Sequence, residues 1–432
     1  MYRRFLAALC GICLCLSPCF AGHFRAGGAV RDITPSSDML PLTRAPHVEM
    51  TGVLDPIHVR VIALADDRET ILLVSAETGR SLGPQFADSL SSRTGIPLRN
   101  ILMTSTHTHA APEITGPVDF TGSDRHARWA RLALRQMLSA ADEALSSLEP
   151  ATLGIGYGES YINVNRNAVF NRRERDGSLS ETRGIGWNPT GPTDRELAVI
   201  RFNAVSDGHP IAFLVNYAVH GTVMHANTCL DGKTGISSDI PGFTSAYLEQ
   251  NHPGATAIWL SGAAGDQNPI VQNDLYFRNP ADGTAKTFSG SDYAILEWLS
   301  AIHYADVEKA LGTIAGEDAS VTLSAGYEST SIPGKEGDDV YLSLQYIRIG
   351  TVNLACFSGE LFSTTGRFLK ENAVRPNTLI VNHAWQREEQ DNGYHADDWT
   401  LLHGGFGQRQ ARYLPGYLDN ALLALLHTLE NQ

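Results

Sequence analysis

Residues 100–113 read NILMTSTHTHAAPE and place two histidines, His107 and His109, directly behind an apolar run. The run NILMTST has the composition of a buried strand. If the strand continues through the histidines, its two-residue period turns both imidazoles to one face of the sheet. Two imidazoles on one face are a candidate metal site, although structural histidines on sheet edges give the same pattern. The choice between these interpretations depends on the rest of the chain.

The segments around this stretch predict alternating strands and helices. Two apolar runs, HVRVIALADD and ETILLVSAE, are separated by a polar turn and predict a hairpin. SLGPQFADSLSSRTG predicts a short helix that ends at a glycine, and apolar residues at helical spacing predict a long helix over residues 124–148.

The second half of the chain contains several apolar strands. ATLGIGYGES, ELAVIRFNA, IAFLVNYAVHG and ATAIWLSGAAGD are strand-like, and several of them have no polar face. Such strands indicate a sheet covered on both faces, so helices predicted over 241–250 and 293–311 are expected to pack on it. Further strands (VTLSAGYEST, VYLSLQYIRIG, VNLACFSGE) precede helices at 361–371 and at the C-terminus. The sequence therefore predicts one large α/β domain, with a mixed β-sheet core flanked by helices.

Composition narrows the class of protein. The 432 residues are 43% hydrophobic and 19% charged, which is ordinary for a globular chain, and the formal net charge is −14. An acidic chain without a basic run is a poor candidate for binding nucleic acid or for stable docking on anionic lipid.

The N-terminus resembles an export leader. Residues 1–21 contain two arginines, then an apolar run, then Pro18 and small residues, and this run is too short to span a membrane. We expect a signal peptide at 1–21, a functional domain at 22–432 and a secreted or periplasmic protein. Four of the six cysteines lie in this leader. The remaining pair, Cys229 and Cys356, are expected either to form a disulfide or to stay as two thiols, and they are too few for a Cys-based zinc site.

Two further segments place metal-ligand side chains at strand ends. In FLVNYAVHGTVMHAN an apolar strand leads into His220, and in CFSGELFSTTGRFL another leads into Glu360 just before a helix. The simple alternatives are a solvated histidine at a strand end and an acid in the first turn of a helix. Two histidines and one carboxylate, however, are a set that leaves zinc an open position for water.

Five ordered motifs then give a broad resemblance. The chain resembles the amidase domain of the neutral/alkaline, non-lysosomal ceramidase family in five motifs: THTHAAPE, NYAVHGTVM, SSDIPGF, SGAAGDQNP and SGELFSTTGR. Three further segments fit the same pattern: GGAVRDITP, SAETG and NVNRN. The resemblance covers nearly all of the chain after the leader. It implies a zinc-dependent amidohydrolase that cleaves an N-acyl amide, with ceramide, which yields a sphingoid base and a fatty acid, as one candidate substrate.

The resemblance also assigns roles to individual residues. It implies that His107, His220 and Glu360 bind zinc and that Tyr394, in NGYHADDW, is the fourth ligand, although VNHAWQREEQD makes the preceding connection longer than the family pattern. His109 matches a family histidine that contacts the substrate amide or exchanges protons with the attacking water. This role agrees with the general acid–base chemistry of imidazole.

The remaining assignments concern residues near these motifs. Arg166, in NVNRN, matches an arginine that lines the family's site. Glu77 and Asp239 are interpreted as structural groups or as groups that orient the ligands. Asp266 is interpreted as an acid that hydrogen-bonds its own turn.

The chain also departs from the family pattern. The family's proposed catalytic serine has two candidates here, Ser289 and Ser291, and neither aligns well. No C-terminal β-sandwich domain is expected. Substrate identity therefore stays open between ceramide, another lipid amide and a lipid ester. A non-catalytic zinc protein of the same fold is the alternative from another class. We expect at most transient contact with a membrane surface, and the sequence leaves the oligomeric state open.

Overall fold

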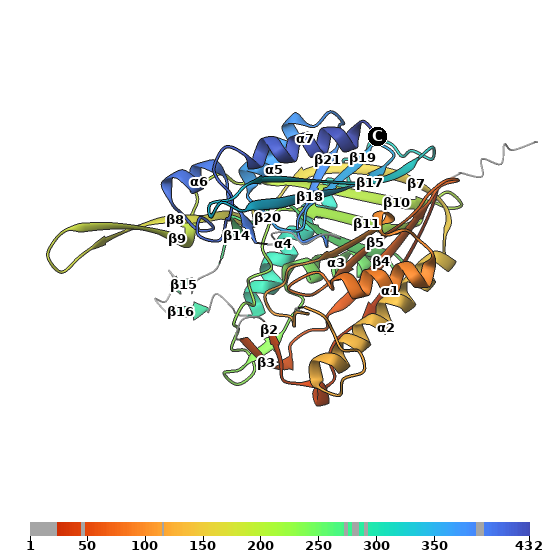
Figure 1. The fold of residues 1–432 in the computed structure, drawn as a ribbon. Coiled ribbons are helices and arrows are strands. Elements are labelled where there is room, and N and C mark those ends of the chain that lie inside the picture. Colours follow the sequence, from red (N-terminus) through yellow and green to blue (C-terminus); the bar gives the residue numbers. More distant parts are fainter. Residues whose placement is uncertain are drawn as a thin grey trace, which may run out of the picture.

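The computed structural model describes residues 24–44, 48–114, 116–271, 275–278, 285–288, 293–385 and 393–432. The predicted leader at 1–21 and the two candidate serines, Ser289 and Ser291, lie outside these ranges. The described chain is a single mixed α/β domain built as two packed sheets between layers of helices (Figure 1). This confirms the predicted fold class.

The larger sheet has eight strands in the order β13-β11-β10-β7-β1-β4-β5-β6. Its strands are β1 (Arg25–Asp32), β4 (His58–Ala65), β5 (Thr70–Ala76), β6 (Ile101–Ser105), β7 (Glu149–Glu159), β10 (Glu196–Ala204), β11 (Pro210–Tyr217) and β13 (Thr256–Ser261). The predicted hairpin is present as the antiparallel pair β4–β5, and β6 and β13 join β5 and β11 in parallel. Strands that run in parallel bring their C-terminal ends, and the loops that follow them, to one end of each half-sheet.

The eight-stranded sheet bends between β1 and β7. These strands pair only through Arg25 with Pro150 and Ala26 with Glu149. Beyond this short junction the two halves approach each other, since β13 contacts β4 and β5. The Ser75 hydroxyl of β5 donates to the Trp259 carbonyl of β13 at 3.1 Å. The bend brings the ends of β6 and β11 together although the two strands are distant in the strand order.

A second sheet packs on one face of the first. It consists of β17 (Leu323–Pro333), β18 (Asp339–Ile349), β19 (Val352–Cys356) and β21 (Thr378–Val381). Buried side chains such as Ile62, Leu214 and Leu354 form one core between the sheets. The expectation that helices cover both faces of a single sheet is therefore wrong for this face. The apolar strands are buried on both sides as predicted, but a sheet can supply that burial as well as helices can.

Helices form the two outer layers. α1 (Pro84–Thr94), α2 (Arg125–Ser146), α3 (Asp239–Asn251) and α4 (Tyr293–Leu311) cover the larger sheet, and α5 (Ser363–Asn372) and α7 (Leu418–Glu430) cover the smaller one (Figure 1). Each of these helices was predicted. The start of α2 is fixed because the Asp124 side chain accepts from the Ala127 amide, and α1 ends at Gly95 with φ 73°. None of the helices within the described ranges combines the length and hydropathy needed to span a bilayer.

The remaining helices and strands were not predicted. They are η1 (Ser37–Met39), β2 (Leu42–Arg44), β3 (Val48–Val53), η2 (Leu98–Asn100), β8 (Asn163–Arg173), β9 (Leu179–Asn188), β12 (Thr234–Ile236), β14 (Gln267–Pro269), β15 (Leu275–Arg278), β16 (Ala285–Phe288), β20 (Glu360–Leu361), β22 (Tyr394–His395) and α6 (Asp398–His403). The hairpin β8–β9 projects from the body of the molecule (Figure 1). The base of β8 is buried, but the rest of the hairpin is half-buried or exposed, and its apolar residues do not alternate regularly with polar ones in the sequence.

The predicted disulfide is not formed. Both cysteines lie in described segments, with Cys229 exposed after β11 and Cys356 buried at the end of β19, and no disulfide joins them. Burial raises the pKa of the Cys356 thiol far above its usual range. The alternative of two separate thiols is therefore the one the structure supports.

Candidate metal and catalytic centre

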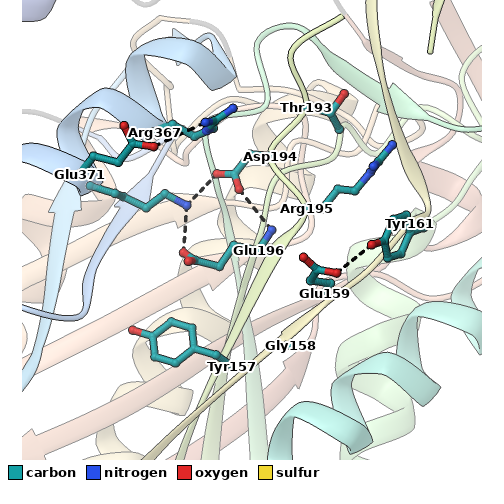
Figure 2. Close-up of a pocket in the computed structure, with 11 residues that line it drawn as sticks. Tyr157, Gly158, Glu159, Tyr161, Thr193, Asp194, Arg195, Glu196, Arg367 and Glu371 are labelled. Carbon is teal, nitrogen blue, oxygen red and sulfur yellow. Dashed lines mark hydrogen bonds and ion pairs between the residues drawn. The ribbon is translucent and has the colours of Figure 1, made fainter. Parts of the chain in front are cut away.

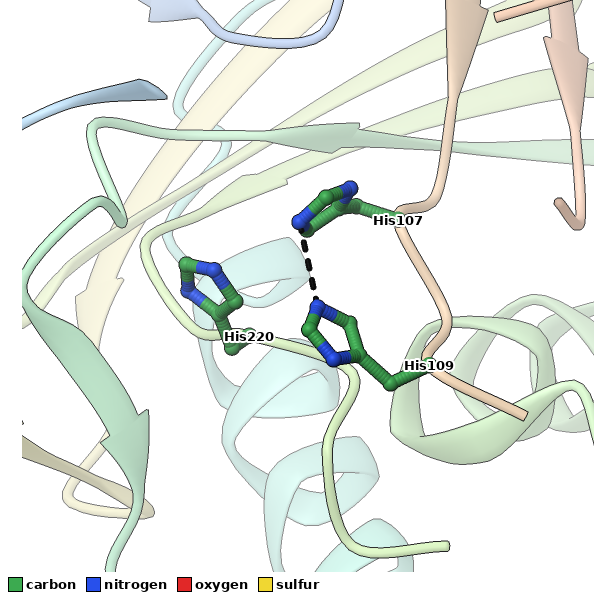
Figure 3. A group of neighbouring side chains, drawn as sticks. All are labelled: His107, His109 and His220. Carbon is green, nitrogen blue, oxygen red and sulfur yellow. Dashed lines mark hydrogen bonds between the residues drawn. The ribbon is translucent and has the colours of Figure 1, made fainter. Parts of the chain in front are cut away.

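His107 and His109 are brought together by a turn. Strand β6 ends at Ser105, and His107 has φ 56°, a left-handed conformation that a strand cannot continue through. The expectation that strand alternation aligns the two rings is therefore wrong. The imidazoles nevertheless meet, with ring centroids 4.8 Å apart and Nε2 atoms 3.2 Å apart (Figure 3).

His220 reaches the same point from β11. Its amide donates to the Gln267 carbonyl at 3.0 Å, which fixes the chain just beyond the strand. The next residue, Gly221, lies against Thr108 so closely that a Cβ there would be 3.0 Å from the Thr108 Cα. A glycine is required for this approach, and the Gly221 carbonyl accepts from the His109 amide at 2.7 Å. The ligand nitrogens of the three histidines all lie within 4.8 Å of one another (Figure 3).

Glu360 adds a carboxylate to the three imidazoles. It is buried at the start of β20, with Oε2 3.0 Å from His220 Nε2 and Oε1 3.6 Å from His107 Nε2. Tyr394 is its direct partner in the parallel pair β20–β22. Burial, together with the Glu360 charge, raises the pKa of Tyr394 to about 12, and its hydroxyl interacts with Glu360 and Arg166. The pairing of two short strands thus places the predicted fourth ligand beside the third.

Arg166 closes the site from the base of β8. Its Nη2 lies 3.1 Å from His220 Nε2 and 3.9 Å from Glu360 Oε2. The guanidinium is held by the Gly265 carbonyl, which accepts from Nε at 3.0 Å and from Nη2 at 2.7 Å, and it lies over the Phe406 ring at 4.5 Å. The structure therefore brings together all six predicted site residues, which come from five separate segments of the chain.

In His107 and His220 the second ring nitrogen, Nδ1, faces a main-chain carbonyl. His107 Nδ1 lies 2.6 Å from the Gly79 carbonyl, and His220 Nδ1 lies 3.2 Å from the Gln267 carbonyl. A carbonyl at Nδ1 holds the proton on that atom and leaves Nε2 with a lone pair. For both residues that Nε2 is the atom turned toward Glu360. This is the arrangement of metal-binding histidines and their outer partners.

The electrostatic state of the histidines agrees with ligation. Burial, followed by the charges of neighbouring groups, holds the pKa of His107, His109 and His220 well below the usual value. All three are therefore neutral imidazoles at physiological pH, which is the form that binds a metal ion or accepts a proton. Imidazole nitrogens with carboxylate and phenol oxygens are ligand types that zinc accepts. The residues present thus fit the metal that the sequence motifs imply.

Sequence reasoning missed two histidines at this site. His383 follows β21, is buried, and stacks on His107 with ring centroids 3.9 Å apart. His225 lies beyond His220, with its ring centroid 5.4 Å from that of His109. The signal for His383 was available, because VNHAW has the same form as the strand end that identified His220. His383 lies in the connection to Tyr394 that is longer than in the family pattern, and the length of that connection does not identify a site residue.

The acidic residues near the motifs serve the scaffold. Glu77 is buried and forms ion pairs with Arg60 and His58, and Asp239 accepts from the Met224 amide behind His220 at 2.8 Å. These two follow the structural interpretation.

The interpretation of Asp266 is wrong. Its carboxylate accepts from Asn165 at 2.7 Å and from the amide of Ser363 at 2.8 Å, so it joins β8 and α5 instead of closing its own turn. Burial raises the pKa of Asp266 to about 6.

A second hollow, of about 480 Å³, contains no predicted site residue (Figure 2). Several of the charged residues that line it are paired with one another. The Lys370 ammonium lies 2.7 Å from Asp194 and 2.9 Å from Glu196, and the Arg367 guanidinium lies 3.4 Å from Glu371 (Figure 2). Ions that neutralise one another in this way stabilise the surface and leave little charge for a ligand, so the histidine cluster is the stronger candidate site.

Comparison with known proteins supports the same fold. No protein-family model and no curated protein matches the sequence. Among solved structures, the neutral ceramidase from Pseudomonas aeruginosa matches with a TM-score of 0.68 over 94% of this chain and 75% of that chain, at 15% identity. A structure described as ceramidase complexed with C2 matches with a TM-score of 0.67 over 94% of this chain and 74% of that chain, at 14% identity. The chain therefore has the fold of the neutral ceramidases, as its ordered motifs predicted.

Proposed function

We propose that this protein is a zinc-dependent hydrolase of N-acyl amides, with ceramide as one candidate substrate. In this proposal His107, His220 and Glu360 bind the metal and Tyr394 is the fourth ligand. The observation that carries it is the shared geometry of the two histidines, whose Nδ1 atoms face main-chain carbonyls while their Nε2 atoms face one carboxylate. The ceramidase fold supports the same reaction class.

The chain's own residues supply the proton transfers. Zinc, when bound, polarises the amide carbonyl and lowers the pKa of water. His109 is a neutral imidazole beside the proposed ligands, so it can take a proton from the attacking water. It then gives that proton to the amide nitrogen as the C–N bond breaks, which releases a carboxylic acid and an amine. Arg166 lies beside Glu360, with Nη2 3.9 Å from Oε2, and its charge favours the ionised form of that proposed ligand.

We further propose that residues 1–21 are an export leader and that residues 22–432 form the hydrolase domain. The protein would then act outside the cytoplasm, as a secreted or periplasmic enzyme. Its lipid substrate would be met at a membrane surface or in a dispersed form, without insertion of the protein.

Mass spectrometry of reaction mixtures tests the proposed function. Purified protein is incubated with N-acyl sphingoid bases and with other N-acyl amides, with zinc and with a chelator. We expect release of free amine in the zinc samples, loss of release with chelator, and loss in the His107→Ala variant. His209→Ala, which alters an exposed histidine paired with Asp207, serves as the control and should retain activity. Failure of the zinc-loaded protein to hydrolyse any amide of the panel would refute the proposal.

A further inference from the structure

Arg44 is a buried cation at the edge of the histidine cluster. It ends β2, its residue surface is 9% exposed, and its Nε lies 3.1 Å from Glu113 Oε1. Glu113 packs against Gly79, where a Cβ would come within 2.3 Å of Oε1, and Gly79 is the residue whose carbonyl faces His107. Arg44 is thus connected to the proposed metal ligand His107 through two intervening residues, Glu113 and Gly79.

The Arg44–Glu113 pair does not satisfy the polar atoms that it buries. Despite the short distance, Arg44 Nε forms no aligned hydrogen bond with any residue the structure describes, and neither does Glu113 Oε2. The ion pair with Glu113 offsets part of the cost of burying the guanidinium, but the poorly aligned Nε–H leaves the rest of that cost in place. An acceptor brought by a ligand would remove this cost.

The Arg44 charge acts directly on the site. After burial, Arg44 is the largest cause that lowers the pKa of His225, whose ring centroid lies 5.4 Å from that of His109. Burial lowers the pKa of Arg44 itself, opposed by Glu113, Tyr394 and Glu360. Groups on four different segments therefore share the electric field of this one guanidinium.

The balance of charge around the cluster is positive. Three cations (Arg44, Arg80, Arg166) and two anions (Glu113, Glu360) contact one another or the histidines, which leaves one positive charge in excess. A bound divalent ion would increase the excess. This local sign is opposite to the net charge of −14 for the whole chain.

We propose that Arg44 is a specificity-determining residue that binds a carboxylate of the substrate, so that the preferred substrates are N-acyl amino acids. This inference rests on the proposed function, because it names the substrate class of the same site. Hydrolysis of such a substrate adds water across the C–N bond and yields a fatty acid and an amino acid. A carboxylate matches the guanidinium because two parallel N–H donors meet two oxygens. One excess charge also suits a monoanion better than a phosphate.

Binding of uncleavable ligands tests this inference without relying on turnover. The probes are the ketone analogue of N-dodecanoylglycine, in which a methylene replaces the amide NH, and the alcohol in which CH2OH replaces its carboxylate. Isothermal titration of the purified protein should show the acid binding about 10- to 100-fold more tightly than the alcohol, the scale of one charged hydrogen-bonded contact. Arg44→Gln should reduce that preference to about two-fold, and Arg44→Lys should retain part of it.

The controls separate this inference from misfolding. Arg93→Gln alters an exposed arginine that pairs with Asp142, and it should keep the full preference for the acid. Thermal unfolding checks that Arg44→Gln is folded, and the ratio of acid to alcohol binding in the unaltered protein is decisive even if that variant is not. Equal binding of the two ligands to the unaltered protein overturns the inference, as does an equal loss of both in Arg44→Gln.

A parallel hydrolysis assay separates it from the proposed function. N-dodecanoylglycine and N-dodecanoylethanolamine are compared by kcat/KM. Turnover of both without preference for the acid refutes the role of Arg44 and leaves the hydrolase intact. A carboxylate preference in binding, with no turnover of any amide, supports the subsite and refutes the hydrolase.

Discussion

His383 and His107 stack face to face, with ring centroids 3.9 Å apart and an interplanar angle of 10°. His383 follows β21 of the smaller sheet, whereas His107 follows β6 of the larger sheet. The stack fixes the plane of the His107 ring. The contact between Nδ1 and the Gly79 carbonyl fixes which way the ring points within that plane. One sheet therefore orients a proposed metal ligand that belongs to the other.

The stack leads to a prediction about metal affinity. His383→Ala removes the ring that holds His107, and zinc affinity should fall by about 10- to 100-fold, the usual scale for groups that orient a ligand. His383→Phe keeps an aromatic face and should stay close to the unaltered protein. Competition with a chromogenic chelator measures the zinc Kd. His403→Ala, which removes an exposed ring stacked on Trp399, is the control. Equal affinities of the Ala and Phe variants would show that stacking does not matter.

Metal content tests the ligand set itself. We expect about one zinc ion per chain after zinc-replete purification, and its loss in His107→Ala and in His220→Ala, because each change removes an inner ligand. Elemental analysis of dialysed protein provides the measurement, with His126→Ala, a half-buried histidine in the first turn of α2, as the control. Unaltered protein that contains no bound metal would contradict the proposed centre.

His109 is predicted to act on protons and not to hold the metal. His109→Ala should keep the zinc content near that of the unaltered protein, while kcat falls by about 100-fold or more, as expected for a general acid–base group. Metal analysis and steady-state kinetics on the same preparation distinguish the two roles. If this variant loses zinc as fully as His107→Ala does, His109 is a ligand, which the 3.2 Å approach of the two Nε2 atoms would also allow.

Glu77 is predicted to stabilise the fold in a pH-dependent way. It is buried, and although burial opposes ionisation, Arg60 and His58 hold its pKa below the usual value. Glu77→Gln leaves Arg60 partly unpaired and should lower the free energy of unfolding by about 3–5 kcal/mol at pH 7. A depressed carboxyl pKa stabilises the folded state above the unfolded value of about 4.3, and this contribution is lost as the pH falls through the folded pKa.

Denaturant titrations across pH check this prediction. The unaltered protein should lose stability below about pH 4.3, and the Glu77→Gln variant should show a shallower loss over the same range. Glu143→Gln breaks an ion pair with Arg31 in which the glutamate side chain is 51% exposed, and it should change stability by less than about 1 kcal/mol. Parallel pH curves for the unaltered protein and Glu77→Gln would count against the assigned role.

Much of the fold could be predicted because local patterns and burial agree. The α2 segment was predicted from apolar residues at helical spacing, and several of these residues are buried in the structure. The partner that covers an apolar strand could not be predicted, because Leu354 looks the same whether it packs on a helix or on another sheet. The β8–β9 hairpin escaped because its apolar residues do not alternate regularly with polar ones.

The residues that meet at the candidate site could be predicted from the sequence, but their geometry could not. Strand ends followed by histidine or glutamate identified His107, His220 and Glu360, since a strand end is a local signal. The left-handed turn at His107 and the close approach at Gly221 depend on contacts between distant segments, which the sequence does not display. Arg44 was missed because β2 is only three residues long and its partner Glu113 lies in a separate loop.

The bend between β1 and β7 makes the centre depend on segments that are far apart in the sequence. His220 and Glu360 are 140 residues apart, and their side chains meet where the two halves of the larger sheet and the smaller sheet come together. Contacts over such separations form slowly during folding. A chain that stops before β20 has no carboxylate at this centre, so the proposed ligand set is complete only once Tyr394 has been synthesised. Bound zinc would then link segments that are far apart in the sequence, such as those that carry His220 and Glu360.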